Sequence, residues 1–471
     1  MPAMISNARY RLSPAETPGC CHVDSLTQES ADVASRVLQA NRNAHHVFTS
    51  DEAKMGAYLH NHIVHHTLAL WALGADAETI EQHARFNTSY QLLPRKFVDL
   101  HFVEELGTPD GYCRLLGDQD YFLDFVEFFD REIAKHGYQA VLQKYMLDGS
   151  PIADDLLARM YMGYVHSFMY VGMALEFKQM PLLAEGLAQA AVHHDMYYTD
   201  FLRVAEVYAQ LGEESALPLS GCVDACLQDT VITSCSTVEV HYQFDPEQGK
   251  WKVEEEMIRD YVCKKAFHEL ARVCARYRVD PDNVEKATAE LINTMVWIAA
   301  GAQFPPYECR YDFFLIHGTN ASIWHTSFLE EPSISNKQKA RLLEYTGRVM
   351  LMLYAGMGCP PPRMNWILSH TPRESDSTWS RVIERGLHHA DDGHMIKLIR
   401  AIYHAEAVSR PYEGEPGFRL KQSDFLPCAI AAIDSASEVP MIGIQHFDLV
   451  RGAAWPKAWA KVPIRKEETQ S

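Results

Sequence analysis

Apolar residues recur at the three- and four-residue spacing of an α-helix through most of this 471-residue chain. The helical pattern starts at Ser50, a candidate N-cap, and continues in successive stretches that end at glycine or proline. One segment breaks the pattern, because "TVITSCSTVEVHYQF" is rich in β-branched residues and the "DPEQGK" that follows has turn composition. We therefore predict a mainly α fold, a compact multi-helix single body with a small β-hairpin insertion near residues 231–253.

The same patterns predict the domain boundaries. Residues 1–49 are mixed and polar and form an N-terminal extension, whereas residues 50–455 form the helical domain. Residues 456–471 form a Lys-rich C-terminal tail that we expect to fray. No repeat of fixed period and no low-complexity tract divides the chain further.

The charge balance narrows the classes of partner. The chain carries 62 acidic and 43 basic residues and a formal net charge of −19, which argues against binding to nucleic acid or to anionic membranes. No uncharged apolar run reaches the roughly 18 residues of a transmembrane helix, and the N-terminus lacks the apolar region of a secretory signal. The 11 cysteines include no CxxC pair, so we expect reduced thiols and a cytoplasmic protein. No interface motif marks a protein partner, although the chain length is compatible with a homodimer.

The sequence lacks the common signatures of nucleotide and hydrolase chemistry. The nearest approach to GxGxxG is "YAGMGCPPP", which no strand precedes and in which prolines stand where a helix would start. No Walker A loop, HExxH or GxSxG motif occurs. Histidine is the residue type that stands out, with 23 copies.

Four of these histidines lie within the stretch "YLHNHIVHHTLALWALGA": His60, His62, His65 and His66. If this stretch is helical, His62 and His66 share one apolar face, His65 lies beside that face and His60 points elsewhere. A buried imidazole needs a partner for each ring nitrogen, and neighbouring imidazoles can meet that need by sharing a metal ion. A hydrogen-bonded network of core histidines would do the same, so the residues alone leave both interpretations open.

Three other apolar stretches each carry a histidine: His166 in "YMGYVHSFMYVGMALEF", His317 in "YDFFLIHGTNAS" and His394 in "DDGHMIKLIRAIYH". A lone histidine on an apolar helix is usually a core residue whose ring nitrogens are hydrogen-bonded. The last stretch also carries Lys397, which shares a helical face with His394 and is flanked by apolar residues. The candidates span more than 300 residues, so their spacing alone does not identify a metal site.

Burial would push Lys397 toward its neutral amine, because a buried ammonium group is costly. A neutral amine can add CO2 to form a carbamate. The alternative is an ordinary lysine paired with Asp391 or Asp392. The residues alone therefore indicate an α-helical protein with scattered buried histidines, for which a metal centre is one interpretation.

Four segments, in this order, resemble motifs of the questin oxidase-like family of fungal polyketide pathways. They are "HNHIVHHTLALWALGA", "VHSFMYVGMALEF…AEGLAQAAVH", "DFFLIHGTNAS" and "DDGHMIKLIRA", and the likeness covers roughly residues 50–405. The resemblance implies a mononuclear non-haem Fe(II) centre with these ligands: His62, His166, His317, His394 and a Lys397 carboxylated at its amine by CO2. It also implies that His65 and His66 lie around the metal or in the substrate pocket.

The implied activity is oxidative cleavage of an anthraquinone or a related polycyclic ring. It would proceed by Baeyer–Villiger-type insertion of oxygen or by direct dioxygenation. The chain departs from the family motifs at several positions: Ser167 replaces a proline, Tyr170 replaces a histidine, and Asn320-Ala321-Ser322 replaces Thr-Ser-Ser. We expect Tyr170 to line the pocket, so the substrate is expected to differ from questin.

Three functions follow as hypotheses. The first is a non-haem iron oxygenase that cleaves an anthraquinone-type polyketide with O2 in secondary metabolism, with NADPH as a candidate reductant. The second is a metal-free, NADPH-dependent Baeyer–Villiger-type monooxygenase, against which the missing dinucleotide motif argues. The third is a non-catalytic, polyketide-binding helical protein. We prefer the first, because imidazole and carbamate ligands suit Fe(II).

Overall fold

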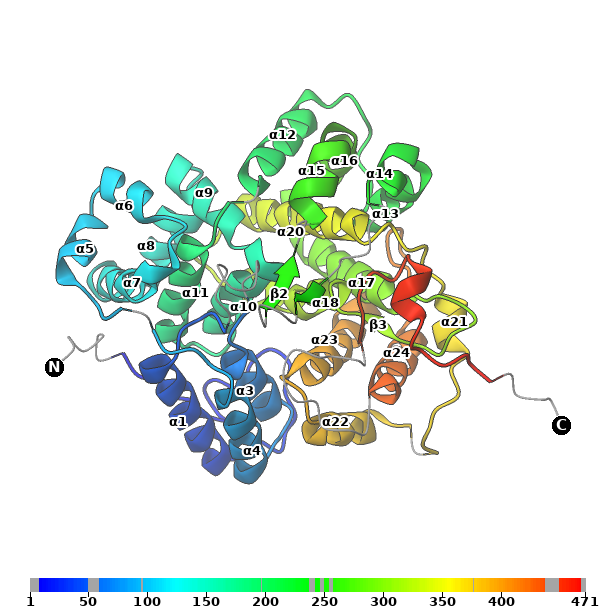
Figure 1. The fold of residues 1–471 in the computed structure, drawn as a ribbon, viewed down its shortest axis with the longest axis horizontal. Helices are drawn as coiled ribbons and strands as arrows, with labels where there is room; N and C mark the ends of the chain where they lie inside the picture. Colours follow the sequence, from blue (N-terminus) through cyan, green and yellow to red (C-terminus); the bar gives the residue numbers. More distant parts are fainter. Residues whose placement is uncertain are drawn as a thin grey trace. The chain divides into compact units, whose positions relative to one another are not determined.

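Helices form almost all of the regular structure in the computed structural model (Figure 1). The structure describes residues 8–49, 59–94, 96–195, 197–236, 242–245, 250–253, 257–375, 377–436 and 449–466. Within this part of the chain, no helix is long and apolar enough to cross a membrane. The predicted mainly α fold is therefore confirmed.

The chain divides into two compact units. The first comprises Met1–Arg203, Gln243–Val253 and Trp324–Leu342, and the second comprises Val204–Tyr242, Glu254–Ile323 and Leu343–Ser471. Two helices, α12 (Tyr198–Leu211) and α20 (Asn336–Gly356), continue through the boundaries between the units. The sequence-based boundaries at residues 49 and 455 stay a prediction.

The first unit is built from these helices: α1 Gln28–Ala44, α3 Ile63–Ala72, α4 Ala77–Thr88, α5 Leu100–Glu105, α6 Pro109–Leu115, η1 Gln119–Tyr121, α7 Phe122–His136, α8 Tyr138–Leu142, η2 Gln143–Leu147, α9 Pro151–Arg159, α10 Met162–Glu176, α11 Met180–Val192 and α19 Trp324–Glu330. Helix α11 packs against both α7 and α10 (Figure 1). The close approach of α10 depends on Gly186, because a Cβ atom there would lie 2.9 Å from Tyr170 Cβ.

The helix that carries His65 and His66 begins at Ile63, whereas the predicted helix start at Ser50 falls on residues that the structure does not describe. Residues 50–58 lie outside the described part of the chain, and the next residues are extended, because His60 forms an antiparallel bridge with Phe48. The side chain of Asn61 accepts the backbone N–H of Ile63 at 2.9 Å, where the helix begins. This start corrects the predicted shared face, because His62 precedes the helix and does not share its face with His66.

The described part of the predicted N-terminal extension packs into the first unit. Tyr10 donates a hydrogen bond of 2.5 Å to Glu185 on α11, and Arg42 donates to the same carboxylate at 2.6 Å. Arg42 also pairs with Asp130 on α7. All four side chains are buried, so residues 8–49 contribute to the core of this unit.

The second unit contains these elements: α13 Leu219–Gln228, α14 Thr230–Cys235, η3 Met257–Val262, α15 Cys263–Lys265, α16 Phe267–Ala275, η4 Pro281–Asn283, α17 Val284–Gly301, β3 Tyr311–Asp312, α18 Leu315–Ser322, α21 Met364–Leu368, α22 Trp379–His388, α23 His394–Ser409, η5 Arg410–Tyr412, α24 Gln422–Ser435, β4 Leu449–Val450 and η6 Pro456–Trp459. Strands β3 and β4 pair in parallel, with Tyr311 opposite Leu449. Helix α18 packs against α17 and α23, which places His317 near His394.

The predicted hairpin is confirmed by strands β1 (Tyr242–Asp245) and β2 (Lys250–Val253), which pair with each other. It is shorter than predicted, because residues 230–235 form helix α14 although they are β-branched. Asp229 accounts for this difference, since its carboxylate accepts the backbone N–H groups of Val231 and Ile232 at 2.8 and 3.0 Å.

The predicted C-terminal tail, residues 456–471, is described as far as residue 466, and residues 467–471 lie outside the described part of the chain. Trp459 is fully buried and donates its indole N–H to the carbonyl of Ala453. Backbone hydrogen bonds from Glu308 to Pro463 and from Arg465 to Pro306 connect the segment further along. The frayed tail stays a prediction.

Candidate functional site

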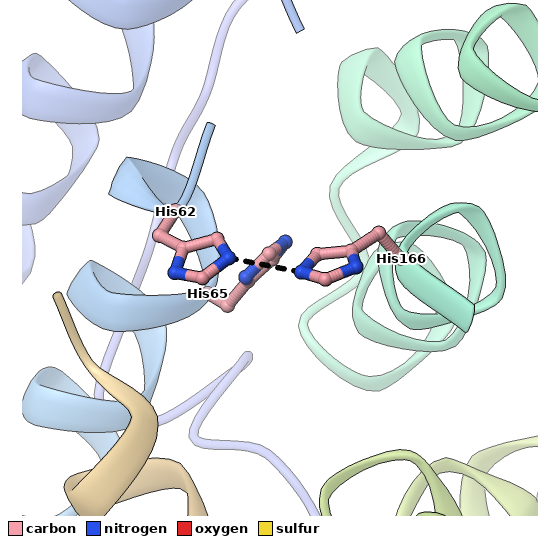
Figure 2. Close-up of side chains that lie close together, drawn as sticks. All are labelled: His62, His65 and His166. Atoms are coloured by element: carbon pink, nitrogen blue, oxygen red, sulfur yellow. Dashed lines mark hydrogen bonds between the residues drawn. The ribbon is translucent and has the colours of Figure 1, made fainter. Parts of the chain in front are cut away.

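Three buried histidines of the first unit point toward one another (Figure 2). His62 is the N-cap residue of α3, His65 lies in the first turn of that helix, and His166 comes from α10. Their candidate ligand nitrogens all lie within 4.8 Å of one another, a separation that a single metal ion could span. Figure 2 shows the rings of His62 and His166 facing each other with His65 beside them, and their Nε2 atoms are 2.9 Å apart.

A left-handed turn aims His166 into this cluster. Gly163, Tyr164 and Val165 have φ angles of 55°, 56° and 63°, which is a rare conformation for a β-branched residue such as Val165. The turn brings the carbonyl oxygen of Gly163 to 2.5 Å from His166 Nδ1. Because a carbonyl oxygen only accepts, Nδ1 carries the proton and the neutral ring has its lone pair on Nε2. That lone pair faces His62.

A second pair of histidines lies next to the first. His60 stacks on His166 with ring centroids 4.1 Å apart, and its Nε2 lies 3.0 Å from His193 Nε2. Gly163 makes room for this pair, because a Cβ atom there would lie 2.5 Å from His60 Nε2 and 2.7 Å from His193 Cε1. Five imidazoles from three chain segments therefore meet around one strained turn.

His65 and His66 have different surroundings, although the family resemblance implied that both lie around the metal or in the substrate pocket. His65 belongs to the cluster, whereas His66 Nδ1 lies 2.8 Å from Asn87 Nδ2 and its ring contacts His83. Tyr170 meets His65 edge-on at a centroid distance of 5.2 Å and donates to the backbone carbonyl of Asn61. Burial raises the pKa of Tyr170 well above its usual value, so this side chain is a neutral phenol.

The other two predicted histidine ligands lie together in the second unit. The rings of His317 on α18 and His394 on α23 are 5.2 Å apart, and both residues are buried. His317 Nδ1 bonds the carbonyl oxygen of Phe313 at 2.7 Å, and His394 Nδ1 bonds Asp392 Oδ1 at 2.5 Å. Both acceptors favour the tautomer with its lone pair on Nε2, as in His166.

Lys397 lies three residues after His394 on α23 and is 3% exposed, so its expected burial is confirmed. Burial lowers the pKa of Lys397 to about 8, although the negative charges of Asp392 and Asp391 act to raise it. About one-tenth of the amine is then neutral at pH 7. Asp391 caps the helix by accepting the backbone N–H groups of Gly393 and Met395, and Asp392 bonds His394.

These donor sets fit a ferrous ion by their own chemistry. Histidines that bind a metal through one nitrogen usually donate the other N–H to a carbonyl or carboxylate oxygen, and three of the predicted ligands do so: His166, His317 and His394. Imidazole nitrogens and carboxylate-type oxygens suit iron. The predicted ligands thus form one pair of histidines in each unit, with Lys397 beside the second pair.

The sequence analysis did not assign two residues that the structure places at these clusters, His193 and Asp392. His193 is the last residue of the "AEGLAQAAVH" segment and directly follows a buried helix. That position was the sequence feature that could have identified it as a candidate site residue. Asp392 was considered only as a partner of Lys397, although it lies two residues before His394.

Comparisons with known proteins identify relatives of this chain. Residues 59–402 match the family model described as "Questin oxidase-like". The chain is 34% identical over 432 residues to "Oxidoreductase AflY" of Aspergillus parasiticus, covering 91% of this chain and 83% of that protein. It is 31% identical to "Questin oxidase" of Aspergillus fumigatus, over 93% of this chain and 95% of that one. It is also 29% identical to "Baeyer-Villiger oxidase ptaJ" of Pestalotiopsis fici, over 98% of this chain and 99% of that one.

Proposed function

The chain belongs to the Questin oxidase-like family and is an oxidoreductase, and we propose that it is an iron-dependent oxygenase that cleaves a ring of an anthraquinone-type polyketide. The relatives named for questin oxidation and Baeyer–Villiger oxidation support the substrate class and the use of O2. One observation supports the iron dependence: the candidate ligand nitrogens of His62, His65 and His166 all lie within 4.8 Å of one another, while a carbonyl oxygen holds the His166 Nδ1 proton.

Ferrous iron bound at these histidines would supply the activation of O2. The residues of the chain would orient the ligand rings. Gly163 O and Asp392 hold the Nδ1 protons of His166 and His394, which keeps the opposite nitrogens oriented. Tyr170, a neutral phenol, packs its ring edge-on against His65 while its hydroxyl donates to the Asn61 carbonyl, which helps to orient the His65 ring.

We propose that Lys397 is carboxylated. Its neutral Nζ would form a bond to the carbon of CO2 and release one proton, which gives the carbamate anion. Counted from the ammonium form, two protons leave and a buried cation becomes an anion. The low pKa of Lys397 supports this step, because only the neutral amine reacts. The carbamate would add a negative oxygen donor to a ligand set of neutral imidazoles.

Metal analysis of purified protein is the first test of the proposed function. We expect about one iron per chain, and removal of iron by a chelator should abolish oxygen consumption with a hydroxyanthraquinone until Fe(II) is returned. Full activity of iron-free protein with NADPH would instead establish the metal-free monooxygenase. Incubation with 13C-labelled bicarbonate should give a carbamate carbon signal by NMR that Lys397→Met lacks, and equal spectra would contradict the carboxylation.

The electron balance separates the two oxygenase chemistries. Insertion of one oxygen atom beside a ring carbonyl reduces the other atom to water and consumes two electrons and two protons, for which NADPH is the candidate donor. Incorporation of both atoms of O2 needs no external reductant. Turnover without NADPH and retention of both labelled atoms from 18O2 in the product would identify the dioxygenase.

A further inference from the structure

Asn320 on α18 is a buried amide without hydrogen bonds. It is 1% exposed, and neither its Oδ1 nor its Nδ2 has a partner among the described residues. Buried polar side chains are almost always hydrogen-bonded, because an unmet donor or acceptor keeps the full cost of leaving water. An amide with both ends unmet therefore indicates a group that is bound there during function.

Another buried amide in the same unit shows the ordinary case. Asn293 on α17 donates to Ser409 Oγ at 3.2 Å and to the carbonyl of Leu420 at 3.1 Å. Its Oδ1 accepts the backbone N–H groups of Arg419 and Leu420 at 3.0 and 3.1 Å. These four hydrogen bonds connect Asn293 to neighbouring segments of the fold, whereas the Asn320 side chain makes no such bond within the described residues.

The packing of α18 places Asn320 on the face of the candidate metal ligand. A Cβ atom on Gly318 would lie 2.8 Å from Met350 Sδ, and Thr319 donates its hydroxyl to the carbonyl of Met295, so this side of α18 is occupied by neighbouring helices. Asn320 follows His317 by three residues, and side chains at that spacing share a face. That face carries the His317 ring toward His394.

A small pocket opens beside the same face. It is lined by Ile316, His389, Asp391, His394, Met395, Leu398 and Leu449. Ile316 precedes Asn320 by one helical turn, so the pocket and the amide lie along the same side of α18. The pocket is not lined by Asn320 itself, and the amide lies on the side of α18 that packs against α23, the helix that carries His394.

We propose that Asn320 is a specificity-determining residue that binds the oxygenated edge of the substrate. Its Oδ1 would accept a hydrogen bond from a phenolic hydroxyl one ring position further from the quinone carbonyl, because a hydroxyl directly beside that carbonyl donates its proton to it within the molecule. The substrate is then a polycyclic quinone with a phenolic hydroxyl that is free to donate. This inference rests on the proposed function, and it explains why this chain has an amide where the family motif has threonine.

The test measures binding without turnover. The anaerobic, full-length protein is titrated with 2-hydroxyanthraquinone, whose hydroxyl is free to donate, and with unsubstituted 9,10-anthraquinone. The wild-type protein should prefer the hydroxylated quinone by about tenfold or more, because only that quinone can donate a hydrogen bond to the buried amide. Asn320→Leu should bind both quinones with similar affinity, and Asn320→Gln should keep part of the preference.

Thermal unfolding without quinone separates binding from folding. Asn320→Leu should melt no lower than the wild type, because it loses no hydrogen bond, whereas the control Asn293→Leu should melt several degrees lower. An undiminished preference in Asn320→Leu, or a melting loss as large as that of Asn293→Leu, would overturn the inference alone. Wild-type protein that binds neither quinone would overturn the proposed function, and the inference with it.

Discussion

His394 Nδ1 lies 2.5 Å from Asp392 Oδ1, and this pair has the same geometry as His166 with the carbonyl oxygen of Gly163. The acceptors differ in kind, because Asp392 can carry a full negative charge and a backbone carbonyl cannot. A carboxylate behind an imidazole raises the basicity of its other nitrogen and fixes the orientation of the ring. His394 is therefore expected to be the more strongly donating of these two candidate ligands.

Asp392→Asn should weaken iron binding about 10- to 100-fold without unfolding the protein, because it removes the charge behind His394. The neighbouring Asp391 supplies the control. Asp391 accepts two backbone N–H groups at the start of α23, so Asp391→Asn should lower the melting temperature and change the iron affinity less. Metal titration and thermal unfolding of both variants check this, and equal iron affinities would contradict the role of Asp392.

His65→Ala should reduce the iron content, and His66→Ala should leave it near that of the wild type. The reason is that His65 joins His62 and His166, while His66 bonds Asn87. Iron analysis of the two variants, with circular dichroism to show retained helices, measures the difference. Loss of iron from His66→Ala but not from His65→Ala would show that the histidines are assigned in the wrong order.

The helices were predictable because their apolar spacing is local. Local patterns miss the effects of single side chains: Asn61 accepts the backbone N–H at the start of α3, Asp229 turns a largely β-branched run into α14, and Trp459 is buried in the C-terminal segment. Each of these effects depends on a single hydrogen bond or a single buried ring. Averages over a window of residues do not contain that information.

The site could be predicted only in part for the same physical reason. His62, His166, His317 and His394 stood out because a polar ring on an apolar helix is unusual. The turn at Gly163 could not be foreseen, since left-handed φ angles at Tyr164 and Val165 run against their intrinsic preference. It is this turn that brings the Gly163 carbonyl to His166.

Glu290 should make the stability of the protein depend on pH. Burial raises its pKa from 4.5 to about 7, partly offset by hydrogen bonds from the Ser220 backbone and the Thr294 hydroxyl. Because the folded state holds this proton more tightly than the unfolded state, the stabilisation is complete below about pH 4.5 and is lost as the pH rises through 7. The total change is up to about 3 kcal/mol.

Urea unfolding of the wild type and Glu290→Gln at pH 5 and pH 8 tests this dependence. The glutamine stays neutral, so the stability of Glu290→Gln relative to the wild type should increase between the two pH values. Glu413→Gln, at an exposed position, is the control and should show no such change. A constant difference between wild type and Glu290→Gln would contradict the raised pKa.

Gly163→Ala should disturb both histidine pairs at once. The added Cβ would press on the rings of His60 and His193, and alanine at a φ of 55° adds strain of about 1–3 kcal/mol. Gly149→Ala isolates the strain, because Gly149 has a φ of 76° and a Cβ there would meet nothing within 4 Å. Both variants should therefore be less stable in urea, but only Gly163→Ala should also lose iron. Normal iron content in a folded Gly163→Ala protein would show that the turn does not position His166, whatever its effect on stability.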